Sequence, residues 1–231
     1  MADAHAHAAA HDTPPELRHH FVDMQAQREA SSLGMWIFLV TEALFFGGLF
    51  LAYSIYRETY RAAFEGASNL LDLTLGTTNT IVLIVSSLTM ALAVWASQQG
   101  RKALLTLFLA LTMILGLAFL GIKFVEYKQK FERHEVPGPH FVVPLNEETH
   151  QPLPRQSEMF FTLYFCMTGL HAAHMIIGLG LLTWLLVKTR KNEFTVRYNT
   201  PVDLVGLYWH FVDIIWIFLF PLLYLLGRHT L

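Results

Sequence analysis

The sequence predicts an all-α integral membrane protein built as a bundle of five membrane-spanning helices. Of its 231 residues, 54% are hydrophobic and only 15% are charged, whereas an ordinary soluble domain carries about 25% charged residues. Five apolar runs are each long enough, at roughly 20 residues or more, to cross a bilayer core about 30 Å thick. These runs cover residues 33–56, 73–97, 103–126, 159–187 and 205–226. The composition excludes a soluble enzyme. The net charge of -2, without a dense basic stripe, excludes a nucleic-acid-binding protein.

The runs divide the chain into a polar N-terminal arm, residues 1–32, and one membrane domain, residues 33–231. The arm contains five closely spaced histidines, a residue type that can bind zinc or copper. Because a polar terminal segment has little apolar surface to bury, we expect the arm to be solvated rather than a metal site. The histidines are His5, His7, His11, His19 and His20.

One long loop, residues 127–158, joins the third and fourth spans. Its five prolines and Gly138 exclude a regular helix, so we expect the loop to pack on the membrane surface or on a partner. The shortest inter-helix loop, residues 98–102, carries only basic charges. Basic loops favour the cytoplasmic side of the membrane. This loop follows two spans, so it lies on the same side as the N-terminus and predicts that the N-terminus is cytoplasmic.

Glu42 is an acidic residue inside the first span. It lies roughly 13 Å below Leu33 at about 1.5 Å per helical residue, which is near the middle of a bilayer. A carboxylate at that depth costs several kcal/mol unless it is protonated, paired or hydrated. Two interpretations remain open: a structural hydrogen bond to a neighbouring helix, or a position on a proton or lipid-linked path.

Three further pairs of polar residues repeat an i, i+3 spacing, which places both members on one helix face. His171 and His174 cannot occupy both axial positions of one haem iron, so the spacing favours hydrogen bonding over ligation. His210 and Asp213 predict a buried, charge-assisted pair that locks helices together. Lys123 and Glu126 predict a pair at the end of the third span, with the lysine reaching the membrane interface.

Two other features concern the ends of the spans. The five tryptophans fall mostly near these ends, as interfacial aromatic residues do. Pro221 predicts a kink or the loss of a hydrogen bond near the end of the last span.

Four segments in the same order resemble subunit III of the haem–copper oxidases, the cytochrome c oxidase subunit III family. They are YWHFVDIIWIFLFPLLYLL at 208–226, LGMWIFLVTEALFFGGLFLAY at 33–53, TNTIVLIVSSLT at 78–89 and YFCMTGLHAAHMIIG at 164–178. Longer members of that family have seven helices, and this chain resembles the last five.

The resemblance implies a non-redox subunit of a respiratory terminal oxidase in a bacterial inner membrane. Such a complex passes electrons from cytochrome c to oxygen and pumps protons. Haem and copper would be held by the partner subunits I and II, and this chain would carry no cofactor, metal or catalytic residue. It would support sustained proton uptake and hold structural phospholipid.

The same resemblance implies roles for particular residues. Glu42 resembles the family's buried carboxylate, which reacts with carbodiimide and is linked to proton uptake. Glu126 falls where FVEY resembles the family's Glu-Tyr at the end of a helix. The residues that match polar positions of the family's bundle are His171, His174, His210 and Asp213.

Other functions remain open at the level of sequence. Within the family, the chain could serve a quinol oxidase or a nitric oxide reductase as an accessory subunit. Outside it, Glu42 and the histidines could belong to a stand-alone proton channel or transporter, or the chain could anchor haem b.

Overall fold

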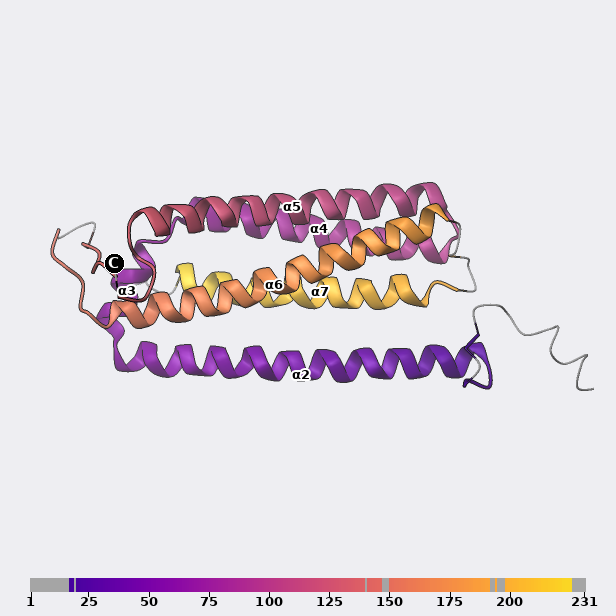
Figure 1. Ribbon diagram of the computed structural model, residues 1–231, viewed down its shortest axis with the longest axis horizontal. Coiled ribbons are helices and arrows are strands. Elements are labelled where there is room, and N and C mark those ends of the chain that lie inside the picture. Colours follow the sequence, from indigo (N-terminus) through magenta and orange to yellow (C-terminus); the bar gives the residue numbers. More distant parts are fainter. Residues whose placement is uncertain are drawn as a thin grey trace, which may run out of the picture. The chain divides into compact units, whose positions relative to one another are not determined.

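The computed structural model describes residues 17–18, 20–139, 141–146, 150–191, 194 and 198–225, and these form helices and no β-strand. Five of the helices are long and apolar enough to cross a membrane, which confirms the predicted fold class. The helices, labelled in Figure 1, are α2 (Met24–Thr59), α3 (Arg61–Asn69), α4 (Leu73–Gln98), α5 (Lys102–Glu132), α6 (Ser157–Arg190), α7 (Thr200–Phe220) and the π-helical turn η1 (Pro221–Leu225).

The chain divides into two units, residues 1–41 and 42–231, so the division falls within α2 rather than at the end of the expected arm. In the first unit, α2 begins at Met24, inside the predicted arm. The Asp23 carboxylate accepts a hydrogen bond from the Ala26 amide at 2.7 Å, which is a favourable start for a helix. Of the arm histidines, His5, His7, His11 and His19 lie outside the described residues.

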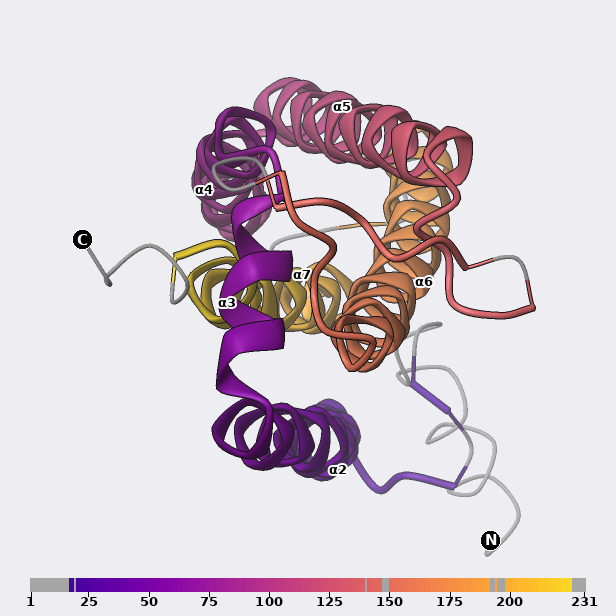
Figure 2. The same ribbon diagram turned by 90° about the vertical axis from the view of Figure 1, so that its left-hand side faces the viewer.

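In the second unit, α4, α5, α6 and α7 form a ring in which each helix contacts the next and α7 closes back on α4. Figure 2 shows these four helices nearly end-on, with α3 running across one end. The Asp72 carboxylate begins α4 by accepting hydrogen bonds from the amides of Thr74 and Leu75. Gly100, at φ 68°, makes the tight turn into α5, a backbone conformation that favours glycine.

Two of the five tryptophans fill the middle of this ring and so depart from the interfacial position expected of most of them. Trp209 and Trp216 are fully buried, whereas Trp36, Trp95 and Trp184 are exposed. Both buried indoles find partners on α4: Trp209 Nε1 donates to Ser86 Oγ at 3.0 Å, and Trp216 Nε1 donates to Thr80 Oγ1 at 3.1 Å. These hydrogen bonds satisfy the indoles inside the bundle, so they do not need water at the interface.

The Trp209 ring is in close contact with glycines on two neighbouring helices. A Cβ atom added at Gly178 of α6 would lie 2.9 Å from the ring, and one at Gly116 of α5 would lie 2.8 Å from it. Glycine at these positions therefore allows the three helices to approach closely.

We expect Gly178→Val to lower the free energy of unfolding by about 1–3 kcal/mol, because the added side chain overlaps a rigid indole. Gly180→Val is the matched control, since nothing lies within 4 Å of a Cβ atom at that position on the same helix. Unfolding of the purified protein in mixed detergent and sodium dodecyl sulfate measures both. Equal losses in the two variants would contradict the prediction.

The end of α7 shows how the protein accommodates Pro221. There the α-helix gives way to η1, and side chains from other helices satisfy the carbonyl groups of this turn. Tyr53 OH donates to the Leu222 carbonyl at 2.9 Å, and Ser68 Oγ donates to the Leu223 carbonyl at 2.6 Å. The helix is therefore irregular at Pro221, as predicted, and hydrogen bonds from α2 and α3 hold the irregular turn in place.

The loop predicted over residues 127–158 is shorter than expected, because α5 continues to Glu132. Glu135, just beyond the helix, forms a buried ion pair at 2.6 Å with Lys130 of α5. Leu153 is buried where Gly66 of α3 leaves room for it. Part of this loop thus packs on the chain's own α3.

Candidate functional site

Glu42 of α2 contacts a histidine of α6 inside the apolar part of the chain. Its Oε2 lies 3.2 Å from Nε2 of His174, and the two side chains are 22% and 16% exposed respectively. The other ring nitrogen of His174, Nδ1, lies 2.8 Å from the Leu170 carbonyl oxygen. The Phe46 ring packs edge-on against the imidazole at 5.4 Å. The acidic side chain is therefore bonded to a neighbouring helix while part of it stays accessible.

The partners of His174 restrict where its protons can be. A carbonyl oxygen only accepts hydrogen bonds, so Nδ1 must carry the proton in the bond to Leu170. The contact between Nε2 and Glu42 then holds one further proton, on either the nitrogen or the carboxyl oxygen. Moving that proton converts a neutral pair into an ion pair without any change of partners.

A second buried polar cluster joins the end of α5 to α6 and to η1. Lys123 Nζ lies 2.8 Å from Glu126 Oε2 and donates to Tyr224 OH at 3.0 Å and to Tyr164 OH at 3.3 Å. Both tyrosine hydroxyls donate to Glu126 Oε1, that of Tyr164 at 2.8 Å. The ammonium group also lies 4.9 Å from the centre of the Trp216 ring. Every charged atom of the pair thus has partners, as buried charges require.

The predicted Lys123–Glu126 pair is therefore present, but the predicted position of the lysine is wrong. Both side chains are almost fully buried. Lys123 turns inward because two hydroxyl groups, an aromatic face and a carboxylate replace the water that it would otherwise reach at the interface.

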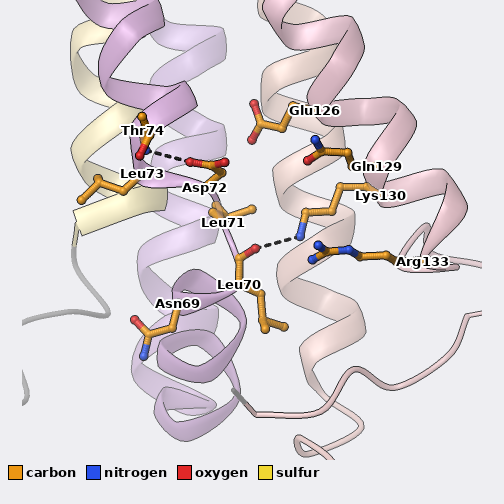
Figure 3. Close-up of a pocket in the computed structure, with 10 residues that line it drawn as sticks. All are labelled: Asn69, Leu70, Leu71, Asp72, Leu73, Thr74, Glu126, Gln129, Lys130 and Arg133. Atoms are coloured by element: carbon orange, nitrogen blue, oxygen red, sulfur yellow. Dashed lines mark hydrogen bonds between the residues drawn. The ribbon is translucent and has the colours of Figure 1, made fainter. Parts of the chain in front are cut away.

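A polar pocket of about 310 Å³ opens beside this cluster. Figure 3 shows its two walls. One is formed by residues 69–74, which run from the end of α3 into the start of α4; the other is formed by the side chains of Glu126, Gln129, Lys130 and Arg133 at the end of α5. Lys130 Nζ bridges the walls by donating to the Leu70 carbonyl at 3.1 Å. The pocket is polar and roomy enough for water, and Glu126 forms part of its lining.

His210 and Asp213 do not form the predicted pair. Nδ1 of His210 lies 2.7 Å from Ser87 Oγ on α4. The buried Asp213 carboxylate lies beside the same hydroxyl group, that of Ser87. The i, i+3 spacing placed the two side chains on one face, but the hydroxyl group on the facing helix is the better-placed partner for the imidazole.

The two histidines of α6 belong to separate environments, although they share the i, i+3 spacing. His174 bonds to Glu42, whereas His171 is buried between the rings of Phe119 and Trp216, at 5.4 and 5.2 Å. In the described part of the chain, neither ring nitrogen of His171 has a hydrogen-bond partner. These histidines therefore do not act together as one site.

Sequence reasoning missed several residues of these sites. Tyr164 and Tyr224 bond to Glu126, and Ser87 bonds to His210. Tyr164 and Tyr224 lie 38 and 98 positions from Glu126 in the sequence, and Ser87 lies 123 positions from His210. A hydroxyl inside an apolar run was the available signal, because such groups need partners in a membrane.

Fold and sites together define a polytopic helical membrane protein with acid–base pairs buried between its helices. The family model described as cytochrome c oxidase subunit III matches residues 141–228. The chain is 30% identical over 220 residues to cytochrome c oxidase subunit 3 of Alkalihalophilus pseudofirmus, a match that covers 95% of this chain and 98% of the relative. The chain therefore belongs to the cytochrome c oxidase subunit III family.

Relatives of a second type are similar to the chain at nearly the same level. It is 28% identical to the probable quinol oxidase subunit 3 of Staphylococcus haemolyticus, over 86% of this chain and 90% of the relative. It is also 28% identical to the quinol oxidase subunit 3 of Bacillus subtilis, over 84% and 86%. This chain is thus a subunit III of a bacterial haem–copper oxidase of the cytochrome c or quinol type, part of an oxidoreductase complex with other subunits.

Proposed function

We propose that the chain is subunit III of a cytochrome c-oxidising, proton-pumping oxidase in a bacterial inner membrane, with its N-terminus in the cytoplasm. In this role it sustains proton uptake and stabilises the complex and its bound phospholipid. The match to the cytochrome c oxidase subunit 3 of A. pseudofirmus, over nearly the full length of both chains, supports the donor type.

The contact between Glu42 and His174 carries the proton-linked part of the proposal. In the proposal, the Glu42 carboxyl group, whose side chain is 22% exposed within an apolar span, shares with His174 a proton that it can exchange. A carboxyl group and an imidazole that share one proton can take up a second proton or release the first. The chain would then hold protons in reserve for the subunit that reduces oxygen.

Haem and copper belong to the partner subunits I and II in this proposal. The environment of the buried histidines supports this assignment. Both ring nitrogens of His174 already have protein partners, and aromatic rings enclose His171. Ligation of a haem iron by either residue would require breaking or moving these contacts.

Carbodiimide labelling tests the role of Glu42. A lipid-soluble carbodiimide should label the unchanged chain on the peptide that contains Glu42, because the carboxyl group is partly exposed within the span. In Glu42→Gln this labelling should fall to background, while the initial rate of oxygen reduction stays near normal and activity decays faster during turnover. Mass spectrometry of the labelled peptide and oxygen-electrode recordings measure these effects.

The control for this experiment is Glu132→Gln, since Glu132 is exposed at the end of α5. That variant should keep both the label on Glu42 and the stability during turnover. Unchanged labelling in Glu42→Gln would contradict the assignment. Unchanged decay during turnover would contradict the proton-linked role.

The relatives of S. haemolyticus and B. subtilis favour quinol oxidase as the second candidate. Purification of the complex through a tag on this chain distinguishes a cytochrome c oxidase from a quinol oxidase. A partner that contains the electron-entry copper, seen by copper analysis, supports the cytochrome c type. A purified complex that lacks this copper and oxidises quinol supports the alternative.

A further inference from the structure

The polar pocket at the end of α5 is lined by two opposite charges that do not pair with each other. Arg133 belongs to its α5 wall and Asp72 to the facing wall (Figure 3), and both residues are exposed. Among the described residues, the Arg133 guanidinium group has no carboxylate partner. Asp72 uses Oδ1 to accept hydrogen bonds from the amides of Thr74 and Leu75, at 2.8 and 3.2 Å. Its other oxygen, Oδ2, therefore remains available to a ligand.

The other charged side chains of the pocket already have partners. Lys130 pairs with Glu135 at 2.6 Å, and Glu126 pairs with Lys123 at 2.8 Å. Both pairs are almost fully buried, so they belong to the wall of the pocket. The groups left for a ligand are one cation and one anion, and these fit a ligand that carries both charges.

The pocket lies at the level of lipid headgroups. Its walls are the first residues of α4, which begins at Leu73, and the last turns of α5, which ends at Glu132. At about 1.5 Å per residue, the 31 residues of α5 are longer than a hydrocarbon core about 30 Å thick. The end of this span therefore reaches the headgroup level.

An exposed apolar surface continues from the pocket along both helices. Ile81 lies two turns after Thr74 on α4, and Val125 lies one turn before Gln129 on α5, so each shares a face with a residue that lines the pocket. The two apolar residues are 57% and 48% exposed. A headgroup in the pocket can thus place its acyl chains on this surface, whereas a soluble phosphate compound would not use it.

We propose that this pocket binds the headgroup of a zwitterionic phospholipid such as phosphatidylethanolamine. The phosphate group binds the Arg133 guanidinium, whose planar fork matches phosphate oxygens, and the ammonium group donates to Oδ2 of Asp72. The pocket volume of about 310 Å³ lies at the lower end of the usual range for ligand sites, about 300–1,000 Å³. The proposal rests on the phospholipid-binding part of the proposed function, for which it names a site and a lipid class. It does not depend on the electron donor or on Glu42.

Counting the lipids of the purified complex tests the site. The intact complex is purified through a tag on this chain and washed in detergent, and native mass spectrometry counts the phosphatidylethanolamine that it retains. Arg133→Gln should retain about one molecule fewer per complex, because it removes the charge that holds the phosphate group. Lys128→Gln is the matched control, since Lys128 is exposed near the same end of α5 but does not line the pocket. Equal retention in Arg133→Gln and the unchanged complex would overturn the proposal.

Asp72→Asn tests the recognition of the ammonium group. Asparagine begins a helix as well as aspartate does, so this variant removes the charge and keeps the start of α4. In equal amounts of phosphatidylethanolamine and phosphatidylglycerol, the site that Arg133→Gln empties should prefer the first lipid by roughly fivefold. Asp72→Asn should abolish the preference. A site without preference, or a preference unchanged in Asp72→Asn, would overturn the zwitterionic assignment.

A phosphatidylethanolamine with a photoreactive acyl chain distinguishes a lipid from a soluble compound with the same headgroup. Light should attach it to the peptide that contains Ile81 or Val125, and this adduct should be lost in Arg133→Gln. Glycerophosphoethanolamine, which has no acyl chains, should not displace the lipid at the same concentration. Displacement by the soluble compound, or the absence of an adduct on both peptides, would overturn the assignment to a lipid.

This test and that of the proposed function fail separately. Equal retention of lipid with and without Arg133 would overturn the pocket alone and leave phospholipid binding by the complex in place. A washed complex without any phospholipid would overturn both. Carbodiimide labelling of Glu42 is independent of either result.

Discussion

Lys123→Met is expected to lower the free energy of unfolding by about 3–5 kcal/mol, because it leaves the buried Glu126 carboxylate without its cation. The two tyrosine hydroxyls that remain can donate to that carboxylate, but they cannot neutralise it. Detergent-purified protein titrated with sodium dodecyl sulfate gives the unfolding free energy, and thermal loss of the chain from the complex gives an independent measure.

A double variant and a surface variant serve as controls for Lys123→Met. Lys123→Met combined with Glu126→Gln removes both charges, so it should recover a large part of the lost stability. Lys128→Met breaks a pair with Glu132 that is 3.7 Å long and exposed on both sides, and it should cost less than about 1 kcal/mol. A loss in Lys123→Met as small as that in Lys128→Met would show that the buried cluster does not stabilise the fold.

Trp209→Ala is expected to cost about 3–5 kcal/mol, since it empties a fully buried position at which three helices meet. The variant also leaves Ser86 without the donor that reaches it at 3.0 Å. Trp209→Phe keeps an aromatic ring but not the N–H group, so its cost should be smaller. The same titration measures all variants.

The control for this prediction is Trp184→Ala, because Trp184 is exposed on the outer face of α6. It should change the unfolding free energy by less than about 1 kcal/mol. If Trp209→Ala proved no more harmful than Trp184→Ala, the close approach of α5, α6 and α7 would not depend on the indole.

Much of the fold could be predicted because each span is defined by its own residues. An apolar run of sufficient length satisfies its backbone groups as a helix, whatever its neighbours are. The helix α3 was missed because Arg61–Asn69 is too short and too polar to register as a span. Its stability comes from tertiary contacts such as the bond from Ser68 to Leu223. The start at Met24 was missed because good helix formers also occur in solvated arms.

The candidate sites were less predictable, since their contacts join different helices. Spacing along one helix indicated which residues share a face, and it correctly paired Lys123 with Glu126. The same rule failed for His210, whose partner Ser87 lies on α4. Glu42 could be singled out because it is an acidic residue inside an apolar span. Nothing near it in the sequence identified His174 as the side chain that contacts it.

The contact between Glu42 and His174 has a consequence for biosynthesis. The two residues are 132 positions apart, which corresponds to roughly 7–26 s of translation at about 5–20 residues per second. Throughout that interval the first span carries an acidic side chain whose partner helix has not yet been made. Its insertion is therefore opposed by about 3 kcal/mol, which the apolar residues around Glu42 must outweigh. The contact with His174 can reduce this cost only after the ribosome has delivered α6.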